Sequence, residues 1–216
     1  MEVIQNFLRI KNQISDLNPN TKLIAVSKGH NIDKIKFLID SGHLDFGENK
    51  VQEALLKWTD TLNNNKNINL HLIGGLQSNK AKDAFKIFNY IHSLDSEKLA
   101  RIFSDLEKKE LKKIKYFIQV NIGDEPQKNG IKLSLVSDFA RYCIKDLNLN
   151  ILGLMCIPPV NVAPDSYFKK LKKLNEDSYL KDLSMGMSED FETAIKLGST
   201  HVRVGTSIFG QRSSQF

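Results

Sequence analysis

The sequence predicts an α/β fold, a single-domain (β/α)8 TIM barrel with one extra helix at its N-terminus. Three observations predict it. Short apolar runs alternate strictly with amphipathic helical patterns, the runs number eight, and the connections between them are short. Strict alternation indicates parallel strands joined by helices, and a count of eight favours a closed barrel over an open sheet. Because no linker or low-complexity tract divides the chain, we expect residues 1–216 to form one domain.

The individual elements follow from the spacing of the apolar residues. The first segment has a helical period, with apolar side chains at Val3, Phe7, Ile10, Ile14 and Leu17. After Pro19 the pattern changes, and strands are predicted at residues 23–28, 43–46, 70–74, 90–93, 116–122, 151–157, 183–185 and 201–204. Helices are predicted between them at residues 33–41, 51–62, 78–88, 96–111, 133–145, 166–175 and 190–197.

Composition argues against several classes of protein. The net charge of +6 is spread along the chain, and its densest part, residues 108–113, is interpreted as the solvated face of a helix. With one Trp and five Tyr, the chain has little material for stacking nucleic-acid bases. Cys143 and Cys156 have neither C-x-x-C spacing nor a nearby His, so we expect no disulfide and no metal site. The absence of a signal-peptide core or a membrane-length apolar run predicts a cytoplasmic protein without nucleic-acid or membrane partners, and we expect a monomer.

Lys28 is the residue that most needs an explanation. It closes the apolar run of the first predicted strand, where an ammonium group is out of place. Taken alone, the run is better explained by a lysine that extends to the surface as the strand becomes a loop. The alternative is a desolvated amine with a lowered pKa that attacks a carbonyl and forms a Schiff base. A barrel places such a residue at the carboxyl ends of the strands, where active sites lie.

The loops after the seventh and eighth strands have the composition of a phosphate site. Gly186 and Gly205 would let a ligand approach the main chain, and Ser188 and Thr206 supply hydroxyl donors at the start of helical segments. Considered singly, Ser188 fits better as the N-cap of the helix that begins near residue 189. The pairing of two such loops in a barrel favours a phosphate ligand.

Arg203 is predicted to point into the barrel. Strand alternation puts His201, Arg203 and Gly205 on one face, and Val202 and Val204 on the face that packs against helices. A guanidinium group donates hydrogen bonds and accepts none. If it faced a pyridine nitrogen, that nitrogen would stay unprotonated, and the ring would be a weak electron sink.

Several motifs, taken in order, resemble one known family over nearly the whole length of the chain. They are the segments at residues 25–28, 46–49, 51–53, 71–80, 119–121, 128–130, 153–155, 183–188 and 202–210. With these motifs the chain resembles the YggS/PROSC family, the pyridoxal phosphate homeostasis proteins. The resemblance implies a fold-type III PLP barrel, like the N-terminal domain of alanine racemase, that holds pyridoxal 5'-phosphate (PLP). It also implies Lys28 as the internal aldimine, with Asn49, Met155, Ser188, Arg203, Gly205 and Thr206 around the cofactor.

The chain departs from the family pattern at a few positions. His30 stands where a second lysine is usual, Lys50 where a tyrosine is usual, and Leu70 where an aromatic residue is usual. The stretch at residues 167–183 is short for the family. The change at His30 argues against an exchange of cofactor with a second lysine there, whereas Lys128 keeps another family lysine in a loop.

Three functions are compatible with these residues. The favoured one is a non-catalytic carrier that buffers PLP inside the cell and delivers it to apo forms of PLP-dependent enzymes. The alternative is an amino-acid racemase-like enzyme, which needs acid–base groups on both faces of the substrate. His71 or His201 could supply one, although a histidine on a strand is more often a packed, hydrogen-bonded residue. A weaker third interpretation, a phosphosugar-type barrel enzyme, would use the same phosphate loops and has no need of a Schiff base at Lys28.

Overall fold

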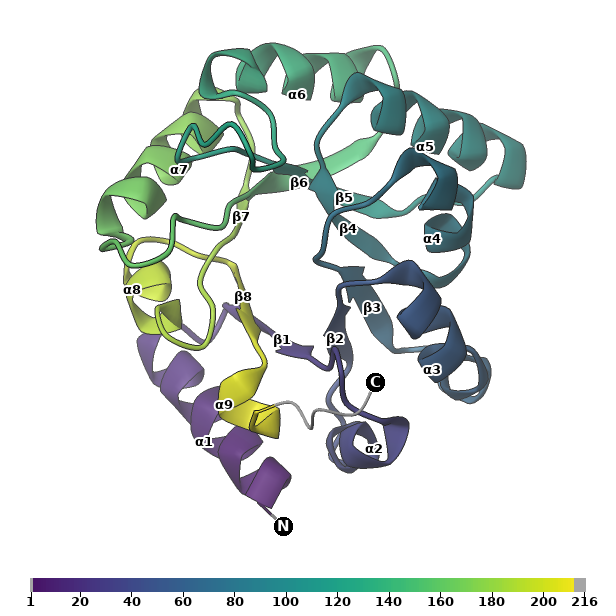
Figure 1. The fold of residues 1–216 in the computed structure, drawn as a ribbon, viewed down its shortest axis with the longest axis vertical. Coiled ribbons are helices and arrows are strands. Elements are labelled where there is room, and N and C mark those ends of the chain that lie inside the picture. The colour runs from purple at the N-terminus through teal and green to yellow at the C-terminus, as the bar shows by residue number, and fades with distance from the viewer. Residues whose placement is uncertain (1, 212–216) are drawn as a thin grey trace.

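The computed structural model describes residues 2–211 and confirms the predicted barrel. Eight parallel strands pair in chain order, and β8 pairs with β1 to close the ring (Figure 1). The strands are β1 (Lys22–Val26), β2 (Asp45–Glu48), β3 (Asn69–Leu72), β4 (Tyr90–Leu94), β5 (Lys115–Gln119), β6 (Asn150–Met155), β7 (Asp182–Ser184) and β8 (His201–Val204).

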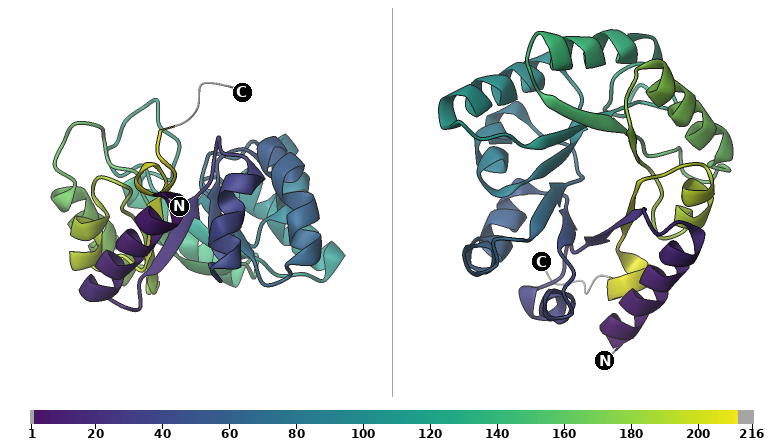
Figure 2. Two further views of the ribbon diagram at one scale, coloured as in Figure 1. Left: turned by 90° about the horizontal axis from the view of Figure 1, so that it is seen from below. Right: turned by 180° about the vertical axis from the view of Figure 1, so that it is seen from behind.

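Helices surround the ring of strands, as the two further views in Figure 2 show. This arrangement follows from the parallel pairing, because each connection must return the chain along the outside of the sheet. The helices are α1 (Glu2–Leu17), α2 (Ile32–Asp40), α3 (Val51–Asn64), α4 (Ala81–Ile87), α5 (Glu97–Glu110), α6 (Val136–Lys145), α7 (Asp165–Asp177), α8 (Phe191–Lys196) and α9 (Thr206–Phe209). Short 3-10 turns, η1 (Ser78–Lys80) and η2 (Leu133–Leu135), precede α4 and α6.

Four strands end two or three residues earlier than predicted. The predicted strands extend to Lys28, Gly74, Ile122 and Ile157, but β1, β3, β5 and β6 leave the sheet before these residues. The residues beyond the ladder stay apolar for other reasons. Ile122 is buried in the core, and Ile157 lines a cavity at the end of the barrel. Apolar character at the end of a strand therefore does not distinguish sheet pairing from burial around a site.

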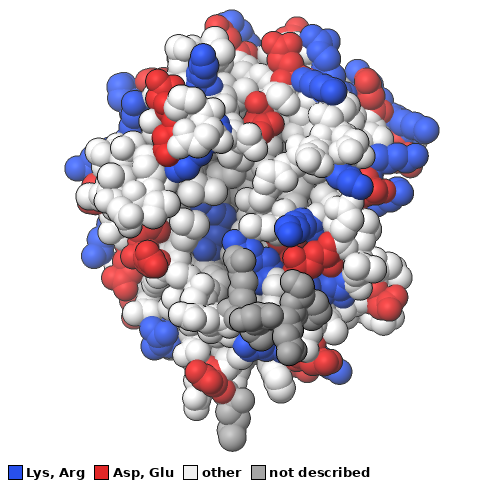
Figure 3. Space-filling model, viewed as in Figure 1, with Lys and Arg blue, Asp and Glu red and all other residues white. Residues whose placement is uncertain are grey.

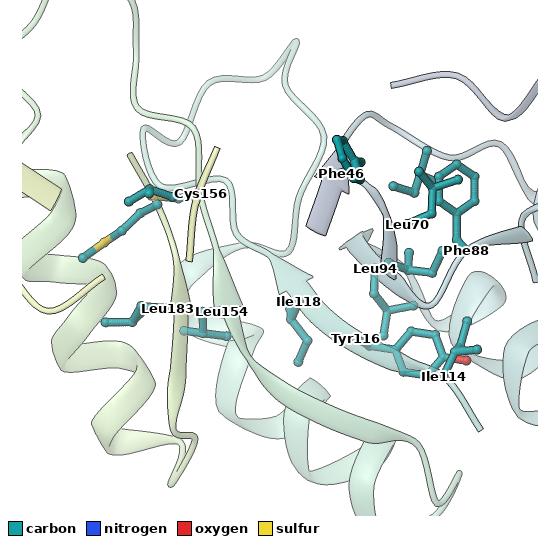
Figure 4. Packing of buried hydrophobic residues seen from close by; sticks show 14 of the residues in the cluster. Phe46, Leu70, Phe88, Leu94, Ile114, Tyr116, Ile118, Leu154, Cys156 and Leu183 are labelled. Atoms are coloured by element: carbon teal, nitrogen blue, oxygen red, sulfur yellow. The ribbon is translucent and has the colours of Figure 1, made fainter. Parts of the chain in front are cut away.

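The barrel has two apolar layers, as strand alternation requires. The larger one lies between the strands and the helices, and Figure 4 shows part of it, including Phe46, Tyr116 and Ile118. A smaller cluster of Tyr90, Phe117 and Met155 lies apart from it. Phe117 stands between Tyr116 and Ile118 on β5, so it points to the opposite face, into the barrel.

Helix α1 packs beside the last strand–helix unit. It contacts α9, α8 and α2, and Figures 1 and 2 show it alongside α9. Phe7, Ile10 and Ile14 form its buried face, and the Asn6 side chain donates to the carbonyl of Ile208 at 3.4 Å. Since α9 has a single turn, α1 supplies the apolar cover that a full helix after β8 would give.

Two further findings concern the part of the chain that the structure describes. Within residues 2–211, no helix combines the length and the apolar character that a membrane crossing requires. In the same part of the chain, no cluster of three or more His, Cys, Asp or Glu residues could hold a metal ion. Both cysteines are free thiols in the core, and burial raises the pKa of each to about 12.

Candidate functional site

A cavity of about 330 Å³ lies at the carboxyl ends of the strands. Figure 3 shows this face of the molecule, with a central hollow and basic side chains beside it. The lining comes from the segments that follow β1, β2, β3, β6, β7 and β8. Six of the seven predicted site residues line it, namely Lys28, Asn49, Ser188, Arg203, Gly205 and Thr206.

Lys28 lies in the turn between β1 and α2. The strand ends at Val26, and the Ser27 N–H still donates to the carbonyl of Gly47 at 2.9 Å. Gly29 then adopts a φ of 71°, a left-handed conformation that glycine accepts without steric cost. The turn therefore places Lys28 at the cavity, half-buried, and not within the strand as predicted.

Ser188 and Gly205 join the two loops of the predicted phosphate site. The N–H of Gly205 donates to Ser188 Oγ at 3.3 Å, which holds the β7–α8 loop against the start of α9. The alternative role of Ser188 as an N-cap is wrong, because Asp190 precedes α8 and accepts from the N–H of Met187 at 2.6 Å. Thr206 begins α9 and is exposed, as a ligand donor must be. The first N–H groups of any helix lack intrahelical acceptors.

The two glycines of these loops differ in role. Gly205 lines the cavity, and a Cβ there would lie 3.1 Å from the carbonyl oxygen of Val26. Gly186 is not among the lining residues. Its φ is 93°, and a Cβ would lie 2.6 Å from Cβ of Ala194. The close packing of α8 is therefore a sufficient reason for glycine at 186, and the close approach of a ligand there stays a prediction.

Arg203 points into the barrel, as the alternation of β8 predicts. Its guanidinium is buried and donates to Ser184 Oγ at 2.6 Å and to the carbonyl of Cys156 at 2.9 Å. The valines on either side of it belong to the outer apolar layer. Arg203 thus forms a rigid floor of the cavity that can donate hydrogen bonds and cannot accept a proton.

A chain of hydrogen bonds continues from Ser184 through the barrel. Ser184 Oγ is 2.9 Å from His92 Nδ1, His92 Nε2 is 3.0 Å from His71 Nδ1, and His71 Nε2 is 3.0 Å from Asp45 Oδ1. Burial lowers the pKa of both imidazoles. Burial opposes ionisation of Asp45, but the hydrogen bond and charge of His71 together with Lys22 outweigh it, and the pKa of Asp45 is lowered.

The chain has one consistent direction when both histidines are neutral. His71 donates to the Asp45 carboxylate, so its other nitrogen accepts from His92, whose second nitrogen accepts from the Ser184 hydroxyl. Ser184 remains free to accept from Arg203. His71 is therefore a packed, hydrogen-bonded residue. His201 is also buried, with a partner at Thr200, and neither histidine lines the cavity.

Met155 is the predicted site residue that does not line the cavity. It is buried beside Tyr90 and Phe117 in the smaller cluster. Its assignment to the cofactor remains a prediction. Lining residues that the sequence analysis missed include Ile73, Ile157 and Asp190. Their only signal was their position, since Ile73 and Ile157 lie within two residues of the ends of β3 and β6, and Asp190 directly precedes α8. Lys128 lies in the β5–α6 loop and pairs with Glu125 at 2.7 Å.

Two further histidines, the half-buried His43 and the buried His201, make the fold sensitive to acid. Burial lowers the pKa of His43 to about 4 and that of His201 to about 3. In the unfolded chain both imidazoles titrate near pH 6.5. Below that pH, and above the folded pKa values, the unfolded imidazoles are protonated whereas the folded ones stay neutral. Stability is then full above about pH 6.5 and falls as the pH drops toward the folded values.

From about pH 7.5 to about pH 5.5, we expect the unfolding free energy to fall by about 1.4 kcal/mol for each of these two groups. Urea unfolding at the two pH values measures the loss. His43→Gln keeps an N–H donor for the Asp45 carbonyl, which His43 Nε2 contacts at 2.9 Å. It should remove one of the two contributions, and an unchanged pH dependence in this variant would contradict the assignment.

Comparison with known proteins places these features in a family. The sequence matches the family described as alanine racemase, N-terminal domain, over residues 2–213. It is 35% identical over 221 residues to the pyridoxal phosphate homeostasis protein of Pasteurella multocida (strain Pm70), covering 98% of this chain and 95% of that protein. It is 37% identical over 205 residues to the protein of that name from Aquifex aeolicus (strain VF5), covering 88% of this chain and 87% of that protein.

Solved structures agree with the sequence relatives. PipY of Synechococcus elongatus PCC7942, with PLP bound, has a TM-score of 0.88 and 32% identity, covering 96% of this chain and all of that chain. Alanine racemase from Corynebacterium glutamicum, at 15% identity and a TM-score of 0.69, covers 100% of this chain and 62% of that one, and shows a likeness of fold. On its sequence and its barrel, this chain belongs to the pyridoxal phosphate homeostasis protein family, built on the N-terminal domain of alanine racemase.

Proposed function

We propose that this chain binds PLP in the cavity through an imine with Lys28 and acts as a carrier in PLP homeostasis. One observation carries the proposal. A lysine from the β1–α2 turn and the paired loops of Ser188, Gly205 and Thr206 line the same cavity of about 330 Å³. That volume is at the lower end of the range for small-molecule pockets. The names of the relatives and PLP-bound PipY support the choice of ligand.

The residues present fit the chemical groups of PLP. Hydroxyl and main-chain N–H groups at the two loops suit a phosphate dianion. A neutral Lys28 amine can add to the aldehyde carbon to give a carbinolamine, which loses water as the C=N bond forms. In that step the aldehyde oxygen leaves as water, and no oxidant or reductant is needed.

Arg203 favours a carrier over an enzyme. Its guanidinium is fixed by Ser184 and by the carbonyl of Cys156 and has only donors to offer. A pyridine nitrogen that faced it would accept a hydrogen bond and stay unprotonated. The ring would then withdraw electrons only weakly from a neighbouring carbanion, which would leave the imine as the main electron sink and slow the removal of an α-proton.

The positions of His71 and His201 point the same way, although His30 lines the cavity. A racemase-like enzyme would need a second acid–base group opposite the lysine. His71 and His201 were the candidates, but both are buried in hydrogen-bonded positions away from the lining of the cavity. The two sequence relatives, from Pasteurella multocida and Aquifex aeolicus, are described as homeostasis proteins and not by an enzyme name.

The carrier proposal is tested by incubating the PLP-loaded protein with a panel of amino acids in deuterated water. Loading is followed by the appearance of a visible absorption band. We expect no exchange of the α-hydrogen at enzymatic rates, on the order of 1 per second or faster. Exchange at such rates would establish the racemase-like alternative, because it reports proton abstraction even when no product accumulates.

A second arm measures delivery. The loaded protein is mixed with an apo PLP-dependent enzyme, and the recovery of enzyme activity is compared with the rate of PLP release into buffer. We expect recovery to be faster than free release allows. Recovery limited by release would reduce the proposed role to passive buffering and would argue against delivery.

A further inference from the structure

The turn that carries Lys28 is held by charged side chains on both sides. The carbonyl of Ser27, just before Lys28, accepts from Lys57 Nζ at 2.9 Å. The N–H of Gly29, just after it, donates to Glu53 Oε1 at 2.6 Å. The main chain on both flanks of Lys28 is therefore tied to α3, an element that belongs to the next strand–helix unit.

Lys57 joins these contacts into one network. Its ammonium has three donors, and it contacts three acceptors at 2.9 Å each, namely the Ser27 carbonyl, Glu48 Oε1 and Glu53 Oε1. Glu48 Oε1 also accepts from Ser27 Oγ at 2.7 Å and from Trp58 Nε1 at 2.9 Å. We call Glu48, Glu53 and Lys57 the Lys28 clamp.

The secondary structure explains how three distant residues meet. Glu48 is the last residue of β2, beside the end of β1, because Val26 and Gly47 are paired in the ladder. Glu53 and Lys57 are four residues apart on α3 and so occupy one face, one turn apart. The β2–α3 unit thus places two carboxylates and an ammonium directly over the β1–α2 turn.

Burying the charged groups of the clamp costs free energy, which makes the clamp a poor way to stabilise the fold alone. Glu48 is fully buried, and within the described residues its Oε2 has no hydrogen-bond partner. Burial raises the pKa of Glu48, although the Lys57 charge and the bonds from Trp58 and Ser27 oppose the rise. Apolar residues of similar volume commonly stabilise a core as well as or better than a buried ion pair. The free-energy cost of burying these charges is explained if they fix the geometry of the β1–α2 turn.

We propose that Glu48, Glu53 and Lys57 are positioning residues that hold the main chain at Lys28 so that its amine meets the aldehyde of a bound PLP. This inference rests on the proposed function. Imine formation requires the amine and the carbonyl carbon to meet within a narrow range of geometry. The phosphate loops hold one end of the ligand from β7 and β8, so the β1–α2 turn must hold the other reactant.

Glu53→Ala tests the clamp with the least damage to the fold, because Glu53 is partly exposed and its loss strands no buried carboxylate. The expected effect of Glu53→Ala is a shift from covalent to non-covalent binding of PLP. The ratio of imine to bound but unreacted PLP should fall at least about tenfold. The visible band and the borohydride-trapped adduct report the imine, and equilibrium dialysis reports total PLP.

Three comparisons separate positioning from general damage. Pyridoxine 5'-phosphate lacks the aldehyde, so Glu53→Ala should bind it as wild type does. Glu53→Gln keeps an acceptor for the Gly29 N–H and should restore most of the imine. Asp60→Ala removes an exposed acidic residue from the same helix and should change the binding of neither PLP nor pyridoxine 5'-phosphate.

The outcomes are distinct. An equal loss of pyridoxine 5'-phosphate and PLP binding would overturn the clamp and indicate a merely structural role. A Glu53→Ala protein with the wild-type imine ratio would also overturn it, while leaving the proposed function standing. A wild-type protein with no adduct at Lys28 would overturn the proposed function and the clamp together.

Discussion

Lys28→Ala should abolish the adduct that borohydride fixes between the protein and PLP. Lys28 lines the cavity that is also lined by the two loops of the proposed phosphate site. Without the Lys28 amine, PLP should still bind through its phosphate, but no C=N bond should form and no visible band should appear. Mass spectrometry of the reduced, digested protein measures the effect, as loss of the modified peptide that contains residue 28.

Lys50→Ala is the matched control for this variant. Lys50 is exposed and follows Asn49, a lining residue. The Lys50→Ala variant therefore lacks a lysine close to the cavity but keeps every lining residue. Its reduced adduct should remain on Lys28. If Lys28→Ala formed the same amount of reducible adduct on another lysine, the assignment of the imine would be wrong.

Ser188→Ala combined with Thr206→Ala should weaken PLP binding by roughly two decades or more. Each hydrogen bond lost to a charged group costs about 1.5–3 kcal/mol, which is roughly one to two decades in affinity. The Ser188 change also removes the bond that joins the β7–α8 loop to Gly205. Equilibrium dialysis with PLP measures the affinity.

Pyridoxal provides the comparison for the double variant, because it has the aldehyde but no phosphate. The double variant should bind pyridoxal about as well as wild type does. Ser166→Ala, an exposed hydroxyl on α7, serves as the control and should keep the wild-type preference for PLP. A double variant with an undiminished preference for PLP over pyridoxal would show that the anion binds elsewhere.

The fold was largely predictable because period and alternation are local properties of the chain. Lys28 and Arg203 could be placed at the site for the same reason. One lies at the end of an apolar run, and the other lies between two valines. Position along the barrel axis is not local, so the assignment of Met155, which packs beside Phe117 and is not among the lining residues, stays a prediction. Strand alternation indicates the face of the sheet on which a side chain lies, but not the position of that side chain along the barrel axis.

Contacts between distant elements were beyond prediction from the sequence alone. The chain of hydrogen bonds from Asp45 to Ser184 depends on the register of several strands. The meeting of Lys57 with the Ser27 carbonyl depends on how α3 lies over the neighbouring turn. The pattern shows that Glu53 and Lys57 share a helix face, but not what that face covers.

The packing of α1 against α9 has a consequence for synthesis on the ribosome. The chain emerges from its N-terminus, so the apolar face of Phe7, Ile10 and Ile14 is made long before the strand and helix that it covers. Non-local closure of this kind is slow, and it leaves hydrophobic surface exposed in the interval. Thr206 sits in the same late unit. A nascent chain would therefore complete the proposed anion site and bury its first helix in one late event, and a bound cofactor would favour the finished barrel by mass action.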